Sequence, residues 1–141
     1  MNVPNLLKLA EFLDNLPENY PNFNMGEWVW SDNDSNALAI DELDSVSISE
    51  CGYVACAVGH APQALGLTTS ELEGMDDWLT FINKYLEVTP DEQAWLFSDQ
   101  WETLDNTHKG VAKRIRYTIE NGAFEDIENY KGDLREVYSD Y

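Results

Sequence analysis

The feature that most constrains this chain is a stretch from Leu9 to Asn83 with fourteen Asp and Glu residues and no Lys or Arg. Over the whole chain, 27 acidic residues stand against eight basic ones, giving a formal net charge of −19. A chain with so much like charge stays disordered unless it buries enough apolar surface. Because 43% of its 141 residues are hydrophobic and 12% are aromatic, we expect one domain over residues 1–141.

The same charge limits the possible partners. Each contact with a nucleic-acid phosphate or an anionic lipid needs a cation, so we expect no direct binding to nucleic acid or to a membrane. No apolar run approaches the ~20 residues that cross a bilayer, and residues 1–16 contain acids where a secretory signal would be apolar. The sequence predicts a soluble cytoplasmic protein with a basic partner.

Apolar residues recur at steps of three and four along much of the chain, which is the spacing of one helix face. This pattern predicts a mainly α fold, a compact bundle of five to six helices. A long acidic loop over residues 31–50 interrupts it, and an aromatic stretch at 23–30 indicates a short β-hairpin or extended segment. The expected helices lie at residues 4–17, 51–65, 69–86, 90–101 and 107–121, with a further one over 127–141 that Gly132 weakens.

Local signals mark several helix ends. Thr89, Pro90 and Glu92 predict a start, because they supply a capping hydroxyl, a proline at the first helical position and an acid that closes a capping box. Thr107 is the expected cap of the next helix, and Gly122 its expected end. In the small-residue segment at 51–65, the expected cap is Ser49 and the expected end signals are Pro62 and Gly66.

From residue 1 to about 122, the chain resembles a loose group of small uncharacterised bacterial and phage proteins. The resemblance rests on LAEFLDNLP, FNMGEWV, CGYVACAVGHA, WLF and DNTHKGVAKRIRYTIENG. The central motif of that group is C-G-T-x-A-C-x-x-G-H-A, from which Tyr53 departs, and the loop between Trp30 and Cys51 is long in this chain. The resemblance implies a shared fold and a phage or bacterial origin, without an assigned activity.

The size of the charge suggests one role. A compact chain of this length forms a sphere about 37 Å across, and that length of duplex DNA carries roughly 22 phosphates. A nucleic-acid mimic could thus block the groove of a basic, nucleic-acid-binding host or defence protein, as some small phage inhibitors do. The alternative is that the acidity only aids solubility. The expected partner-binding residues are Asp32, Asp34, Asp41, Glu42, Asp44, Asp76 and Asp77.

Four of the eight basic residues fall in the helix at 107–121, at Lys109, Lys113, Arg114 and Arg116. In a chain of ordinary charge such a helix would suggest nucleic-acid binding, but here the surrounding potential opposes it. We expect these cations to lie against the acidic half of the chain, where they would reduce its self-repulsion.

A second hypothesis centres on Cys51, Cys56 and His60. Cys56 and His60 are four residues apart and would share a helix face, so a thiol and an imidazole could act as nucleophile and base. The competing interpretation is that both are packed among small apolar residues, with His60 bonded to a carbonyl and the thiols reduced. The spacing matches no usual zinc pair, so we expect no metal and no cofactor. The five tryptophans, at helical spacing with Leu and Phe, favour core packing.

Overall fold

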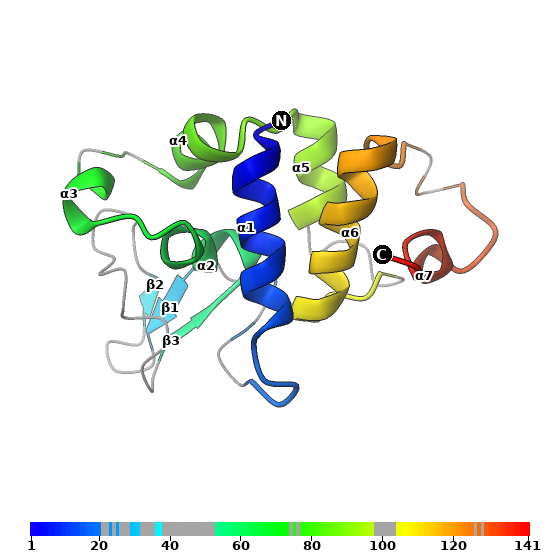
Figure 1. The fold of residues 1–141 in the computed structure, drawn as a ribbon, viewed down its shortest axis with the longest axis horizontal. Helices are drawn as coiled ribbons and strands as arrows, with labels where there is room; N and C mark the ends of the chain where they lie inside the picture. The colour runs from blue at the N-terminus through cyan, green and yellow to red at the C-terminus, as the bar shows by residue number, and fades with distance from the viewer. Residues whose placement is uncertain are drawn as a thin grey trace.

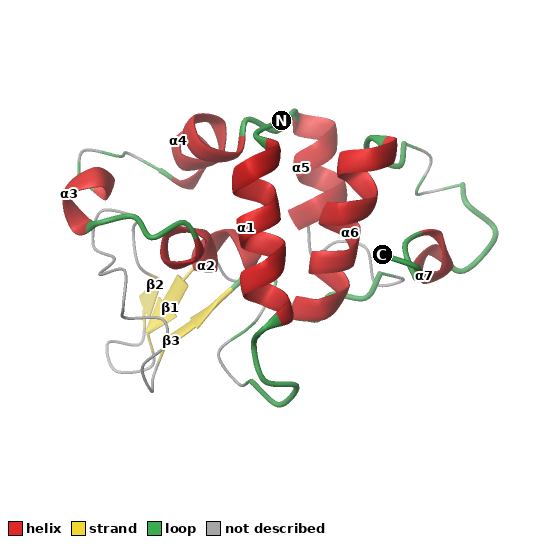
Figure 2. Ribbon diagram, in the orientation of Figure 1, coloured by secondary structure: helices red, strands yellow, loops and turns green. Residues whose placement is uncertain are grey.

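The computed structural model describes residues 1–20, 23, 25, 29–31, 36–37, 53–73, 75, 77–97, 104–125, 127 and 129–141. Within them the fold is mainly helical, as predicted (Figure 2). The helices are α1 (Val3–Asp14), α2 (Ala57–Ala64), α3 (Thr69–Leu72), α4 (Trp78–Phe81), which continues as the π-helix η3 (Ile82–Leu86), α5 (Pro90–Phe97), α6 (His108–Asn121) and α7 (Leu134–Val137).

Helix α1 lies at the centre of the fold, beside α2 and α6 (Figure 1). Leu6, Leu9, Ala10 and Leu13, at the predicted helical spacing, form its buried face and contribute to one hydrophobic core cluster. From α6, Val111, Ala112 and Ile115 meet that cluster and are fully buried. The predicted apolar stripes of these two helices are therefore confirmed, and they face the same core.

Local chemistry explains the ends of α5 and α6. In the capping box of α5, the Thr89 amide donates to Glu92 Oε1 at 2.9 Å and the Glu92 amide donates to Thr89 Oγ1 at 3.2 Å. At α6, the Gly110 amide donates to Thr107 Oγ1 at 3.2 Å. The helix ends before Gly122, whose φ of 81° suits a residue without a side chain. The three predicted boundaries are confirmed.

The strands are β1 (Val29–Ser31), β2 (Asn36–Ala37) and β3 (Tyr53–Ala55), arranged antiparallel in the order β2-β1-β3. Trp30 of β1 is opposite Ala37 on one side and Val54 on the other. Only β1 overlaps the aromatic stretch at 23–30 in which a short hairpin or extended segment was predicted; β2 lies within the predicted loop at 31–50, and β3 comes from further along the chain. The rest of the predicted loop at 31–50 lies outside the described residues.

The helix predicted over 51–65 is wrong at its start. Residues Tyr53–Ala55 pair with β1 as a strand, and α2 begins only at Ala57. Its cap is Cys56, whose sulfur accepts from the Gly59 amide at 3.5 Å, and Ser49 is outside the described residues. Pro62 lies inside α2 and does not end it; Gly66, with a φ of 67°, follows the helix as expected.

The single helix predicted over 69–86 is also wrong. Asp77 has an extended backbone and caps a new helix, so α3 and α4 are separate. The apolar spacing over 69–86 predicts a buried stripe widened by Trp78 and Phe81, and both of these residues are buried. Leu79 alone of the stripe is 52% exposed; its members are Leu72, Met75, Leu79, Ile82 and Leu86.

The C-terminal helix predicted over 127–141 shortens to the single turn α7, which Asp133 caps. Tyr138, just after that turn, packs into the core with 1% of its surface exposed. Core packing of tryptophan is confirmed for Trp78 and Trp95, the two whose side chains are described. None of the helices in the described ranges is long and apolar enough to cross a membrane.

Candidate functional site

Of the seven acids predicted to bind a partner, the structure describes Asp77. Its carboxylate accepts from the Thr80 amide at 2.7 Å and from the Thr80 hydroxyl at 2.9 Å. These hydrogen bonds hold the pKa of Asp77 below its ordinary value, so the exposed carboxylate is charged at neutral pH. Asp77 therefore serves as a helix cap while still presenting its charge. The other six lie outside the described residues: Asp32, Asp34, Asp41, Glu42, Asp44 and Asp76.

Further acids extend the negative surface along α3, α4 and α5. Glu71 closes a capping box with Thr68, and Glu92 closes the one with Thr89. Within the described ranges, no ion pair neutralises the acids of this part of the chain. The exposed acids there are Glu71, Glu73, Asp77, Glu87 and Asp91.

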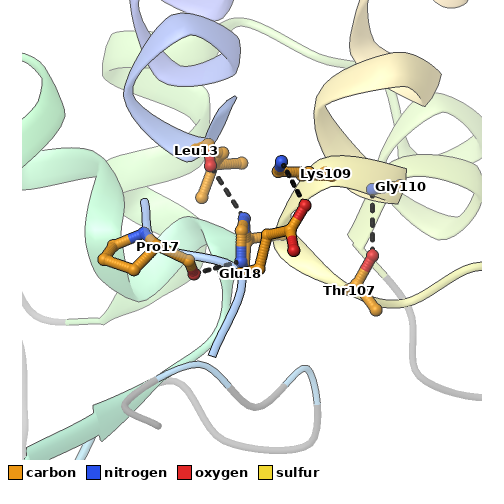
Figure 3. A network of polar contacts seen from close by, with 7 residues as sticks. Leu13, Pro17, Glu18, Thr107, Lys109 and Gly110 are labelled. Atoms are coloured by element: carbon orange, nitrogen blue, oxygen red, sulfur yellow. Dashed lines mark hydrogen bonds and ion pairs between the residues drawn. The ribbon is translucent and has the colours of Figure 1, made fainter. Parts of the chain in front are cut away.

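Two of the four α6 cations, Arg116 and Lys109, lie against the acidic half of the chain as predicted, whereas Lys113 and Arg114 bind other segments. Arg116 forms an ion pair with Asp14, and Lys109 forms one with Glu18 at 3.5 Å (Figure 3). Lys113 donates to the Ser139 carbonyl at 3.3 Å. These three side chains thus bind groups of their own chain, which reduces their effect on the outward field.

Arg114 is fully buried and has no carboxylate partner among the described ion pairs. Its guanidinium donates to the carbonyls of Asp105 at 2.6 Å and Leu96 at 3.1 Å, and lies 5.7 Å from the Tyr138 ring centroid. Burial lowers its pKa, but arginine remains charged in proteins. This side chain joins α5, α6 and the C-terminal segment from the inside.

The second predicted site is a packed cluster. Cys56 is 3% exposed and His60 is fully buried. His60 Nδ1 lies 2.8 Å from the Cys56 carbonyl oxygen, and Nε2 lies 3.3 Å from the Tyr20 hydroxyl. The predicted bond to a carbonyl is therefore found, and both ring nitrogens have partners other than the Cys56 thiol. Cys51 lies outside the described residues, so the structure does not place it at a helix start.

Aromatic rings surround His60. The centroids of Phe12, Tyr20 and Phe23 lie 6.2, 5.7 and 5.6 Å from that of its imidazole. Burial lowers the pKa of His60 from 6.5 to about 4, the bond to Cys56 opposes this shift, and nearby His108 adds to it. His60 is consequently neutral at pH 7.

His108, which the sequence interpretation did not use, connects α6 to the end of α1. Its Nδ1 lies 2.8 Å from the Leu13 carbonyl oxygen and its Nε2 lies 3.1 Å from that of Pro17. Figure 3 shows Leu13 and Pro17 at this junction, next to the Glu18–Lys109 pair. His108 is 5% exposed and its ring lies 5.8 Å from that of Phe23.

Two signals would have found the residues that were missed. Arg114 falls between Val111 and Thr118 at the helical spacing of buried positions, so its inward orientation follows from the period. His108 directly follows the cap Thr107, so the sequence places it in the first turn of α6. Its two carbonyl partners, about 95 residues away in sequence, have no local signal.

No group of three or more His, Cys, Asp or Glu side chains in the described ranges could hold a metal ion. Comparisons with known proteins leave the family open: no protein-family model matches the chain, and searches of curated proteins and of solved structures found no match.

Proposed function

We propose that this chain is a non-enzymatic, acidic interaction protein of phage or prophage origin. It binds a basic surface on a host or defence protein and occupies the place of nucleic acid there. The resemblance to small phage and bacterial proteins supports the origin, and the charge of −19 supports the kind of partner.

One observation carries the proposal: three cations of the basic helix α6 are buried or paired within the chain, whereas Glu71, Glu73, Asp77, Glu87 and Asp91 along α3 to α5 are exposed. Arg114 is buried, Arg116 pairs with Asp14 of α1, and Lys109 pairs with Glu18 of the turn that follows α1. An acidic protein that needed only solubility could leave its cations outside, mixed with the acids. Here Arg114 is buried and Lys109 and Arg116 pair with Glu18 and Asp14, so these cations do not offset the acids of α3 to α5 that a basic groove would meet.

Such a field acts mainly on the rate and selectivity of association. Complementary charges steer two proteins together and raise the association rate constant at low salt, and screening removes this advantage as salt is added. We therefore expect a complex that weakens steeply between about 50 and 200 mM salt, as protein–DNA complexes do.

The experiment is a pull-down from bacterial lysate with the full chain, followed by mass spectrometry and by binding measurements with each captured protein. The expected partner is basic, binds DNA or RNA, and loses the nucleic acid when this chain is added. A partner that binds this chain and its nucleic acid together, or a complex indifferent to salt, would refute the proposal.

Two variants of equal net charge test whether binding depends on the position of the acids or only on the total charge. Asp32, Asp34, Asp41, Glu42 and Asp44 are changed together to the corresponding amides in one variant. In the control, the same change is made at five acids near the C-terminus. Both variants lower the formal charge from −19 to −14, since five acids are removed from each. We expect only the first to lose the partner. The control acids are Glu125, Asp126, Glu128, Glu136 and Asp140.

The second candidate is a Cys/His enzyme or ligand-binding module around Cys51, Cys56 and His60. The contacts of His60 with a carbonyl and a hydroxyl favour a packing role for that side chain. Iodoacetamide treatment of the native protein discriminates between the two. Slow modification of both thiols, accelerated only by denaturant, supports the packing role, and rapid alkylation of Cys56 at neutral pH supports the enzyme.

A further inference from the structure

Four aromatic side chains near the C-terminus keep part of their surface exposed. Tyr130 is 41% exposed, and Tyr117, Phe124 and Tyr141 are half-buried. They form two pairs: the ring centroids of Phe124 and Tyr130 lie 5.2 Å apart, and those of Tyr117 and Tyr141 lie 5.5 Å apart. We call these four rings the aromatic face. The side of the fold that carries α7 and the C-terminus lies opposite α3 (Figure 1).

The buried ring of Trp95 supports both pairs. Its centroid lies 5.5 Å from that of Phe124 and 6.2 Å from that of Tyr117, and its own side chain is fully buried. The Tyr130 ring lies against the backbone of Gly132, where a Cβ atom would stand 2.9 Å from Tyr130 Cε1. The rings are therefore held by packing from below and by a glycine that leaves room for the outermost one.

The geometry of the pairs leaves ring faces available. Both are T-shaped, with interplanar angles of 86° and 88°, so the edge of one ring meets the face of the other. A ring that contributes its edge does not use its own faces in that contact, and such faces attract cations. The chain makes this contact elsewhere: Lys84 lies 5.3 Å from the Tyr85 ring centroid and Arg114 lies 5.7 Å from that of Tyr138. Among the described residues, no lysine or arginine lies over a ring of the aromatic face.

The charge around the aromatic face is negative. Residues 117–141 contain seven acids and two cations, and one of these cations, Arg135, pairs with Asp133 at 2.9 Å. Glu120 is exposed, and its Oε2 accepts from the Tyr141 hydroxyl at 2.8 Å. A carboxylate accepts hydrogen bonds at both oxygens. An anion able to bind a second donor therefore lies directly beside a ring of this face.

We propose that the aromatic face binds arginine side chains of an arginine-rich protein segment. A guanidinium is planar, stacks on aromatic rings and donates to a carboxylate through a fork of N–H groups, whereas an ammonium is a compact and strongly hydrated charge. The rings and Glu120 offer both contacts at one place. Unpaired bases and phosphates offer the same combination of a π face and an anion to arginine. Arginine binding here does not depend on the acidic loop at 31–50 or on its proposed partner.

The first test is a titration of the full chain, 13C-labelled in its aromatic residues, with a short peptide of alternating glycine and arginine. NMR spectra are recorded at about 150 mM salt, where attraction to distant acids is screened. We expect the ring signals of the aromatic face to shift and saturate. A peptide with citrulline in place of arginine has a similar shape without the charge, and it should leave these signals unchanged. Equal shifts with both peptides, or no shift of these rings with the arginine peptide, would overturn the proposal.

The second test repeats the titration with variants and follows the Tyr141 ring, which all of them keep. Tyr130→Ser should weaken binding about two- to fivefold, the effect of one exposed contact between a cation and a ring. Gly132→Ala keeps the tyrosine but displaces its ring, so it should also weaken binding. Leu79→Ala is the matched control, because it removes an exposed apolar side chain away from this face and should bind as the wild type does.

Equal affinities of Tyr130→Ser and Leu79→Ala for the arginine peptide would refute the aromatic face as the site. The variant with five loop acids changed to amides separates this site from the proposed function. It should lose the nucleic-acid-binding partner and keep the arginine peptide. Loss of the peptide in that variant would place peptide binding at the loop and refute the site proposed here.

Discussion

Acidification should destabilise this protein through His60 in a way that can be separated from its many carboxylates. Burial lowers the pKa of His60 from 6.5 to about 4. Between these values the unfolded chain binds a proton at this site that the folded protein excludes. Stability from His60 is therefore fully present above pH 6.5 and is lost as pH falls toward 4.

The size of the effect follows from the same two values. Each pKa unit corresponds to about 1.4 kcal/mol, so a decrease from 6.5 to about 4 corresponds to about 3 kcal/mol. Such a loss is a large fraction of the 5–15 kcal/mol that typically holds a domain folded. The cause is the burial of His60 among three aromatic rings, which offer a charged imidazole no water.

The assay is urea unfolding of the wild type and of His60→Gln, measured at intervals from pH 7.5 to pH 4. The carboxylates titrate in both proteins and cancel in the difference. His60→Gln is expected to be less stable at pH 7.5, because the new side chain packs less well among the rings, and to approach or exceed the wild type near pH 4. A difference between the two proteins that is independent of pH would refute the argument.

Two further predictions test helix α4. Asp77→Ala should lower the thermal midpoint of unfolding because it removes the helix cap, whereas Asp77→Ser should keep the cap and remove only the charge. If Asp77 contacts the partner, both variants should bind it more weakly in titration calorimetry. Unchanged binding would contradict a surface role for Asp77. Phe81→Ala should cost about 3–5 kcal/mol because Phe81 is fully buried, while Leu79→Ala on the exposed side should cost under about 0.5 kcal/mol, both by urea unfolding; similar losses would show that the assigned helix face is wrong.

Several elements were predictable because their signals are local. The caps Thr89 and Thr107 act on amides three residues ahead, and Gly122 ends α6 through its own backbone freedom. The spacing of the leucines in α1 places them on one face, and that face is buried whichever element packs against it. The residues that make these interactions lie within one or two helical turns of each other, so a short stretch of sequence contains all of them.

The failures occurred where distant residues compete for the same segment. Tyr53–Ala55 could join a helix by composition, but pairing with β1 makes it a strand, and α2 then starts at Cys56 and Ala57. Likewise, the single helix expected over 69–86 is interrupted where Asp77 caps a new helix. Leu79 of the expected stripe is exposed there, while Trp78 and Phe81 are buried as expected.

The sequence by itself determined the sign and size of the charge, the mainly helical class and the segregation of basic residues into one helix, because these depend on composition and short-range period. Only the tertiary structure decided what those basic residues do. Contacts between α1 and α6 turn Arg116 and Lys109 toward acids of the N-terminal half, and the same contacts place His108 between two carbonyls. The physical reason is that burial and hydrogen bonding at this junction depend on groups separated by about 90 residues of chain, which no local pattern brings together.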